Sequence, residues 1–244
     1  MAHTSLLAGW ESLPALVYLL TTFVAASTSL PLAWRAARVG TGLALLVAWL
    51  LALHWVLDRL GAPVSVPGLA PGDGVSMVLL PLVTTLGALI VGFSRRYLAG
   101  EPGQRRYLRA LLLTLAAVSV VVSTTHLWLM AAAWTATGLG LHVLLTFYAD
   151  RPAAQLAARK KFVASRVADI AMLAALALFA LDLEAPTLAA LHARLAGAEA
   201  LPWTFHLAAA LLVAAAALRT AQVPAHGWLL QVMEASTPVS ALLH

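Results

Sequence analysis

The sequence predicts an all-α integral membrane protein whose seventh apolar run is interrupted. Hydrophobic residues make up 62% of the 244-residue chain and charged residues only 10%, whereas soluble domains average about 25% charged residues. The apolar residues gather in runs of about 16–22, close to the roughly 20 that a helix needs to cross the bilayer core. The net charge of +5 comes from segments that flank these runs, so we expect no nucleic-acid partner.

The spans follow from the apolar runs and their breaks. Residues 1–12 contain no Lys or Arg, so the first run is predicted to be a retained span and not a cleaved signal peptide. Pro/Gly-rich residues 61–74 are predicted to form a loop, and the amphipathic segment within residues 184–202 to lie along the membrane surface. The predicted spans are about 13–34, 39–57, 75–94, 110–125, 127–147, 162–183, 203–222 with a break at Pro224, and the start of an eighth at 237.

An eighth span that begins at 237 would end after a few residues. We therefore expect residues 1–244 to form one transmembrane domain that is truncated relative to a longer protein, and to correspond to its N-terminal half.

The positive charges are distributed unequally between the two sides of the predicted bundle. If the spans alternate, Arg59 and Arg194 lie on one side, Arg219 lies within a span, and the other twelve of the 15 Lys and Arg residues lie on the opposite side. Since basic loops remain cytoplasmic, this bias predicts that the N-terminus of a multi-pass protein lies outside. The membrane is expected to be the bacterial inner membrane. Lipid is then an expected partner.

Asp169 is predicted to lie inside the sixth span, with Arg166 three residues earlier on the same helix face. Intramembrane acids are costly and usually functional, so Asp169 is a candidate ion-translocation residue tuned by a neighbouring cation. The alternative is a structural ion pair near the interface. Lys161 and Arg166 are supporting candidates.

Arg219 lies deep in the interrupted run, and Pro224, His226, Glu234 and His244 follow it. A guanidinium keeps its proton in proteins, so Arg219 is predicted to neutralise an acid such as Asp169, hold an anion or repel cations. The alternative is structural pairing between helices. His226 and His244 are candidates for a proton wire at the break, together with Glu234.

Other functional classes find little support in the sequence. It contains no nucleophilic triad, no phosphate-binding Gly-Lys motif and no dinucleotide fingerprint, so we expect no catalytic residue and no cofactor. The histidine spacing does not form a closed ligand group, and no metal site is expected. A transporter subunit is therefore favoured over an enzyme. Thr135 and Thr137 are expected to bond back to helix carbonyls, although Thr135 is also a supporting site candidate.

The stretch AQVPAHGWLLQVMEASTPVSALLH resembles the antiporter-type membrane subunits of respiratory complex I and of multisubunit cation/proton antiporters. DGVSMVLL and KKFVASRVADIAML resemble the same family. The resemblance covers residues from about 72 to the end and implies a family fold of about fourteen spans with a broken seventh helix. Asp169, His226, Glu234 and His244 match family positions.

The chain departs from the family pattern at two positions. Pumping members carry a glutamate directly after the tryptophan of the fifth span, where this chain has Thr135. They carry a lysine in the broken helix, where this chain has Arg219. Because the Glu/Lys pair transfers protons in the family, these departures argue against ordinary pumping through this half.

The stretch from HLWLMAAAWTATG to AARKKFVASR is most similar to the membrane subunits of the DabB type, which belong to inorganic-carbon transport complexes. This resemblance implies a cation (H+ or Na+) translocating subunit that energises CO2 or bicarbonate uptake by a DabA-type, carbonic-anhydrase-like partner. Zinc is expected in that partner. The alternative is a proton-pumping subunit of a complex I-like oxidoreductase or a multisubunit antiporter, and a third possibility is a structural anchor without conduction.

Overall fold

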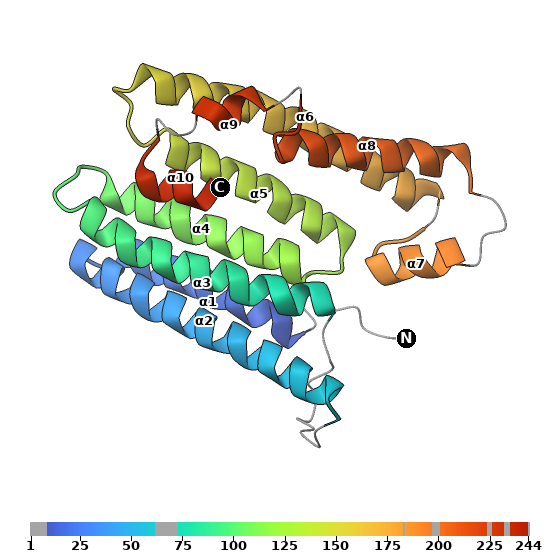
Figure 1. Cartoon of the computed structure of the whole chain (residues 1–244), viewed down its shortest axis with the longest axis horizontal. Coiled ribbons are helices and arrows are strands. Elements are labelled where there is room, and N and C mark those ends of the chain that lie inside the picture. The colour runs from blue at the N-terminus through green and yellow to red at the C-terminus, as the bar shows by residue number, and fades with distance from the viewer. Residues whose placement is uncertain are drawn as a thin grey trace. The chain divides into compact units, whose positions relative to one another are not determined.

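The computed structural model describes residues 9–61, 73–182, 184–196, 201–223, 226–231 and 235–243, and these residues form helices and no β-strand. The predicted all-α class is confirmed. Contacts between Cα atoms divide the chain into two compact units, Met1–Ser123 with Thr237–His244, and Thr124–Ser236. Figure 1 shows the helices of both units coloured along the chain, and each unit is described by itself below.

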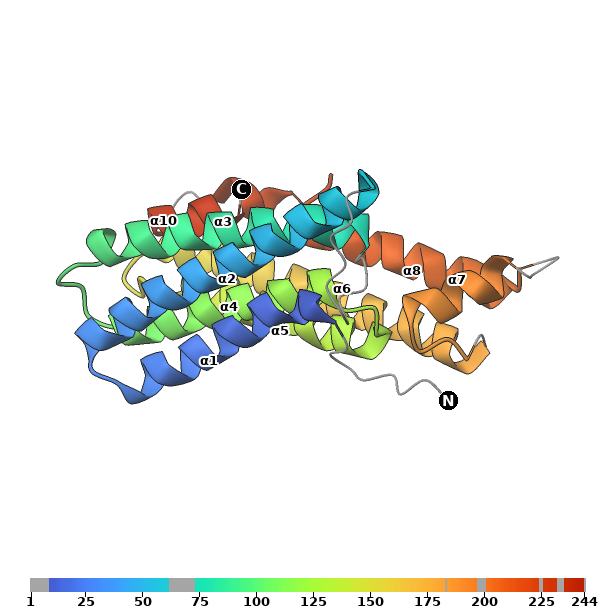
Figure 2. The same cartoon turned by 90° about the horizontal axis from the view of Figure 1, so that it is seen from below.

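The first unit consists of packed helices. Its elements are the 3-10 turn η1 (Trp10–Ser12) and helices α1 (Leu13–Ser27), α2 (Leu30–Arg59), α3 (Gly74–Tyr97), α4 (Gln104–Ser123) and α10 (Thr237–Leu243). Helix α1 packs against α2 and α4, and α3 packs against α2, α4 and α10. Figure 2 shows α1, α2 and α3 lying along one another in a second view.

Two glycines allow the helices of this unit to approach closely. A Cβ atom at Gly40 of α2 would overlap the side chain of Thr21 on α1, and one at Gly87 of α3 would lie 2.9 Å from the hydroxyl of Tyr18. Helices in membranes associate by such close packing, because lipid provides no hydrophobic driving force between them. Helix α3 is capped by Asp73, whose side chain accepts a hydrogen bond from the backbone N–H of Val75 at 2.7 Å.

The second unit contains α5 (Leu127–Leu145), α6 (Pro152–Asp182), α7 (Leu188–Ala196), α8 (Trp203–Arg219) and α9 (Gly227–Gln231). Helix α6 is its centre and packs against α5, α8 and α9. Alanines form much of the core between α6 and α8, and they keep the two helix axes close together. The core alanines on these helices are Ala168, Ala175, Ala208 and Ala215.

Several helix bounds differ from the sequence prediction. The prediction separates the first two spans at residues 35–38, but the chain turns at Thr28, whose backbone is extended, and α2 begins at Leu30. Proline in the first turn of α2 favours this earlier start. Helix α6 likewise starts at Pro152, ten residues before the predicted span, so Arg159, Lys160 and Lys161 are helical and do not lie in a loop.

The break in the seventh run begins earlier than predicted. Helix α8 ends at Arg219, where the predicted run continues to Gln222. The N–H of Gln222 bonds to the carbonyl of Ala217 at 2.9 Å, and Ala221 adopts a left-handed conformation with φ 53°. This is a Schellman-type helix end. Pro224, the predicted break position, lies outside the described residues.

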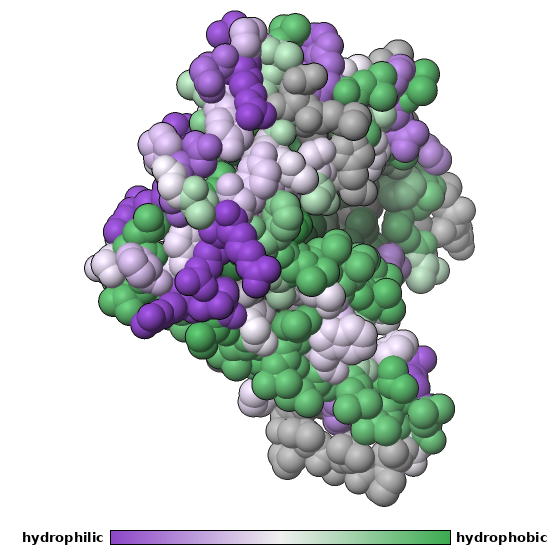
Figure 3. Space-filling view, turned by 60° about the vertical axis from the view of Figure 1, so that its left-hand side comes forward, coloured by the Kyte–Doolittle hydropathy of each residue, from purple (hydrophilic) through white to green (hydrophobic). Residues whose placement is uncertain are grey.

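Five described helices are long and apolar enough to cross a membrane by length and composition, namely α2, α3, α4, α5 and α6. Helix α8 is apolar but has only 17 residues. Large apolar side chains are exposed on both units, for example Phe23 at 74% and Val213 at 70%. Figure 3 shows wide hydrophobic areas beside a group of hydrophilic residues. Exposed apolar surface of this extent is typical of a chain that contacts lipid or other protein.

Candidate functional site

The second unit holds a cluster of four charged side chains, of which Arg166 is partly exposed, contributed by two helices and packed against a third. Lys161, Arg166 and Asp169 come from α6, and Arg219 is the last residue of α8. Asp169 and Arg219 are only 6% and 12% exposed at the side chain. Burying charge in a low-dielectric interior is costly unless the charges are paired, so the pairing of this cluster determines what it can do.

Asp169 is the acid of the cluster and faces two guanidinium groups. Its Oδ2 lies 2.7 Å from Nη2 of Arg166, one turn earlier on α6, and its Oδ1 lies 3.5 Å from Nη1 of Arg219. The sequence predicted the first pair from its spacing and named Asp169 as a partner for Arg219. Neither carboxylate oxygen accepts a hydrogen bond from a described residue, so Asp169 is held by charge and keeps unused hydrogen-bonding capacity.

Arg219 is fixed from a second direction by α5. Its Nη2 donates a hydrogen bond of 2.5 Å to the backbone carbonyl of Trp134, and its Cζ lies 4.8 Å from the centre of the Trp134 ring. A guanidinium has donors in a planar fork and stacks on aromatic rings, and Arg219 uses both properties here. The arginine therefore joins α8 to α5 and to α6.

Gly138 on α5 provides the space for this arrangement. A Cβ atom at this position would lie 2.6 Å from Nη1 of Arg219 and 3.2 Å from Nη2 of Arg166. Sequence reasoning did not single out Gly138, although a glycine inside an apolar helix is a recognised sign of close approach. It also missed the carbonyl of Trp134, because a backbone acceptor leaves no trace in a sequence.

Lys161 is the most buried of the four charged side chains, with only 2% of the residue exposed. Its Nζ donates a hydrogen bond of 2.9 Å to the carbonyl of Gly138. The sequence treated Lys161 only as a supporting residue, because it follows Arg159 and Lys160 in what looked like a basic loop. The helix periodicity turns Lys161 inward and leaves its two neighbours exposed.

Among the described residues, none of the remaining candidates is joined to the cluster by a hydrogen bond or an ion pair. Thr135 is half-buried beside Trp134, and only Thr137 forms the predicted bond, to the carbonyl of Ala133 at 2.9 Å. His226 is exposed just before α9 and forms no hydrogen bond or ion pair with a described side chain. Glu234 and His244 lie outside the described residues.

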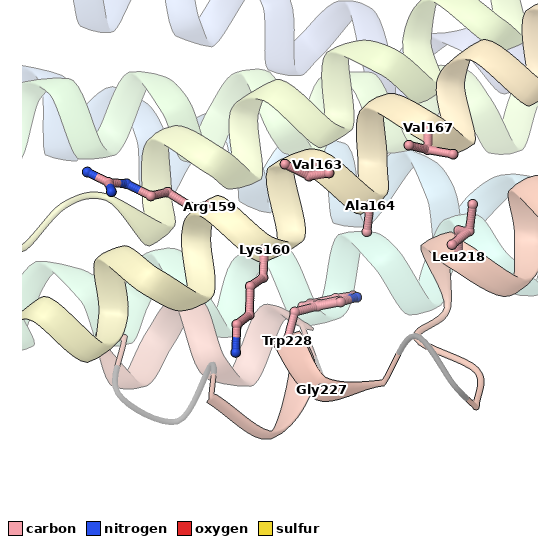
Figure 4. A pocket seen from close by; sticks show the side chains of 8 residues that line it. All are labelled: Arg159, Lys160, Val163, Ala164, Val167, Leu218, Gly227 and Trp228. Atoms are coloured by element: carbon pink, nitrogen blue, oxygen red, sulfur yellow. The ribbon is translucent and has the colours of Figure 1, made fainter.

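A groove of about 600 Å³ lies on the exposed face of α6, next to the start of α9. Figure 4 shows Arg159 and Lys160 projecting from α6 in different directions, with the Trp228 ring beside the helix. None of the four clustered charges lines this groove. Its lining residues are Arg159, Lys160, Val163, Ala164, Val167, Leu218, Gly227 and Trp228.

Comparison with known families assigns the chain to one of them. Residues 123–244 match the family described as NADH:quinone oxidoreductase/Mrp antiporter, TM, and residues 72–108 match the complex I chain 5 N-terminus. The chain belongs to this antiporter-like membrane family. The first match spans half of the chain and includes all four clustered charges, and the resemblance found in the sequence is confirmed.

Two curated relatives and one solved structure are similar to this chain. A probable inorganic carbon transporter subunit DabB2 of Halothiobacillus neapolitanus is 44% identical over 70% of this chain and 31% of that protein. The NADH-quinone oxidoreductase subunit L of Escherichia coli is 36% identical over 70% of this chain and 28% of that protein. A chain in the structure of respiratory complex I from Thermus thermophilus aligns with a TM-score of 0.70 and 25% identity, covering 95% of this chain and 50% of that one.

The chain thus matches about a third of the length of these curated relatives. It is an antiporter-like membrane chain of the multi-pass type, and its fold is the N-terminal half of such a bundle, with the seventh helix divided into α8 and α9.

Proposed function

We propose that this chain forms part of a cation-translocating membrane subunit that energises the uptake of inorganic carbon by a separate, carbonic-anhydrase-like zinc protein. The observation that carries the proposal is the buried cluster of Asp169, Arg219, Arg166 and Lys161 at the end of α8, where the helix is interrupted. An anchor without transport would gain little from gathering three cations around one buried acid.

The cluster has the parts that a coupling site needs. Asp169 supplies a negative charge at the centre of the unit, and Arg219 and Arg166 hold it on two sides. Arg219 cannot give up its proton, so it acts as a fixed charge that responds to a change of charge nearby. A cation that moves past the cluster changes the forces on Arg219, and this arginine transmits them to α5 and α8.

Inorganic carbon uptake is favoured over other roles by sequence similarity and by two residues. The probable inorganic carbon transporter subunit is 44% identical to this chain and complex I subunit L is 36% identical. Thr135 and Arg219 stand where pumping members of the family carry Glu and Lys. In this proposal the DabA-type partner contains the zinc and performs the carbon chemistry, and this chain itself binds no cofactor.

The proposal includes an orientation and a location. The basic residues at the start of α6 and between α3 and α4 would face the cytoplasm, and the N-terminus would lie outside the inner membrane. His226, Glu234 and His244 are proposed to continue the ion pathway beyond the break. Membrane lipid would surround the apolar faces of the helices.

The second candidate is a proton-pumping subunit of a complex I-like oxidoreductase or a multisubunit antiporter. The 36% identity to subunit L favours it. It requires other residues to replace the Glu/Lys pair that Thr135 and Arg219 do not provide.

The partner distinguishes the two functions. The full-length protein carrying an affinity tag is purified from gently solubilised membranes, and the co-purifying proteins are identified by mass spectrometry and analysed for zinc. A stoichiometric, zinc-containing, carbonic-anhydrase-like protein is the expected result. Recovery of quinone-reductase or antiporter subunits instead would replace the carbon uptake proposal with the second candidate.

A further inference from the structure

Lys161 is a buried ammonium group whose only hydrogen-bond partner among the described residues is neutral. Its Nζ donates to the carbonyl of Gly138 on α5. The charged groups that act on it are Arg219 of α8 and Arg166 and Asp169 of its own helix. On the side of α5, the titratable group nearest in the sequence to Gly138 is His142, whose ring packs 4.7 Å from that of Phe162. All these residues belong to the second unit.

Charge counting identifies the proton that can leave this cluster. Three cations and one carboxylate give a net charge of +2 when Lys161 is protonated, because 3 − 1 = 2. Protonation of Asp169 would remove the only negative charge and leave Arg166 and Arg219 facing each other. Deprotonation of Lys161 lowers the net charge to +1, and the neutral amine can still donate a hydrogen bond to Gly138.

We propose that Lys161 is the side chain that takes up and releases the transported ion, and that this ion is H+. The inference deepens the proposed cation translocation and depends on it. In release, one N–H bond of the ammonium breaks, its electron pair stays on Nζ, and the proton passes to a hydrogen-bonded water molecule. Uptake from the opposite side of the membrane forms the same bond again.

The same charges exclude Na+ from the cluster. A metal ion arriving there meets a net positive charge in a low-dielectric interior, where repulsion is strong. The one carboxylate that could bind it, that of Asp169, already faces two guanidinium groups at 2.7 and 3.5 Å. A proton carried on Lys161 needs no such ligand, since it is a bond to nitrogen.

The test uses the full-length protein with its co-purifying partner, reconstituted in liposomes that contain a pH-sensitive dye. Proton flux is measured under an imposed pH gradient in potassium buffer, with and without sodium. Lys161→Gln removes the charge, and Lys161→Arg keeps the charge but cannot release a proton. We expect each variant to lose at least about tenfold in flux, and the exposed neighbour variant Lys160→Gln to retain wild-type flux.

Lys161→His adds a measurement that a merely structural role would not change. Imidazole titrates at about pH 6.5, well below a lysine amine, so partial flux with a pH profile shifted to more acidic values is expected. An unshifted profile for an active Lys161→His, or wild-type flux in an assembled Lys161→Arg variant, would overturn the role of Lys161. Flux that requires sodium would overturn the assignment of H+.

Failure of the proposed cation translocation gives a different result from failure of the role of Lys161. If the wild-type complex carries no cation flux in this assay, the proposed translocation is wrong and the variants are not needed. If the wild type carries protons and Lys161→Arg does so equally, translocation stands and another group carries the proton. Assembly of each variant is checked by size-exclusion chromatography. If Lys161→Gln does not assemble, the proton flux of Lys161→Arg, which preserves the buried charge, is the deciding measurement.

Discussion

Gly138 on α5 and Arg219 on α8 are in direct contact, and a single methyl group on Gly138 would lie 2.6 Å from Nη1 of Arg219. The absence of a side chain at Gly138 is therefore a condition for the ion pair between Arg219 and Asp169. The role of Gly138 in the charged site can be tested separately from its effect on the stability of α5.

We expect Gly138→Ala to reduce transport strongly and to lower thermal stability less than loss of Asp169 does, because the helix preference of alanine offsets part of the cost of the disturbed ion pair. The methyl group displaces the ends of two flexible arginine side chains, and alanine stabilises a helix by about 1 kcal/mol relative to glycine. Transport by the reconstituted protein and its Tm are measured together. Gly92→Ala on α3, where a Cβ would meet nothing within 4 Å, is the control and should transport normally. Full transport by Gly138→Ala would contradict the proposed geometry.

Asp169→Asn should abolish coupled transport, because it removes the only negative charge among the clustered side chains. Breaking a buried ion pair costs about 3–5 kcal/mol, so a lower Tm is expected as well, while the hydrogen bond from Arg219 to Trp134 should keep the complex assembled. Uptake of radiolabelled bicarbonate by cells is the measurement, with expression checked by immunoblot. The exposed Asp150→Asn is the control. Unchanged uptake at normal expression would show that the pathway does not pass through Asp169.

Ala221→Gly should stabilise the protein. Ala221 has a left-handed backbone with φ 53°, which costs an L-residue roughly 1–2 kcal/mol and glycine almost nothing. Part of this gain is offset by the greater freedom of glycine in the unfolded chain, so we expect about 0.5–1 kcal/mol. Ala214→Gly, at an exposed position inside α8, should lower stability by a similar amount. A destabilised Ala221→Gly variant would refute the Schellman-type helix end.

Glu11 makes stability depend on pH. Burial raises the pKa of Glu11 above its ordinary value, and the nearby carboxylate of Asp73 raises it further. Folding therefore favours protonated Glu11, and this contribution to stability is fully present below the ordinary pKa and is lost as pH rises through the raised value. Glu11→Gln should be more stable than the wild type at about pH 8 and equal to it at about pH 4. A difference in Tm that is the same at both pH values would contradict this assignment.

The sequence predicted the chemistry of the cluster better than its geometry. Asp169, Arg166 and Arg219 could be found because charge inside an apolar run is rare, and the spacing of Arg166 and Asp169 placed them on one helix face. Lys161 was undervalued because it continues a basic pair, and only the direction of α6 separates the buried lysine from its exposed neighbours. The predicted run ended at residue 222, before Pro224, whereas α8 ends at Arg219 and Ala221, a residue without a turn preference, adopts the left-handed conformation.

Tertiary contacts account for what the sequence could not provide. The carbonyl of Trp134 and the bare backbone of Gly138 meet Arg219 across 85 and 81 residues of chain, and neither contact has a local signature. The early start of α6 at Pro152 falls in a polar, basic stretch that an apolar-run criterion does not include.

Helix α8 ends at Arg219, and that position has an electrostatic consequence of its own. The aligned peptide dipoles of a helix add up to about half a negative charge at its C-terminus. The guanidinium of Arg219 is therefore attracted both by the field of this helix end and by the carboxylate of Asp169. This partial counter-ion belongs to the backbone, cannot be titrated and remains when the charges around it change. It keeps one cation in place while a proton moves on another.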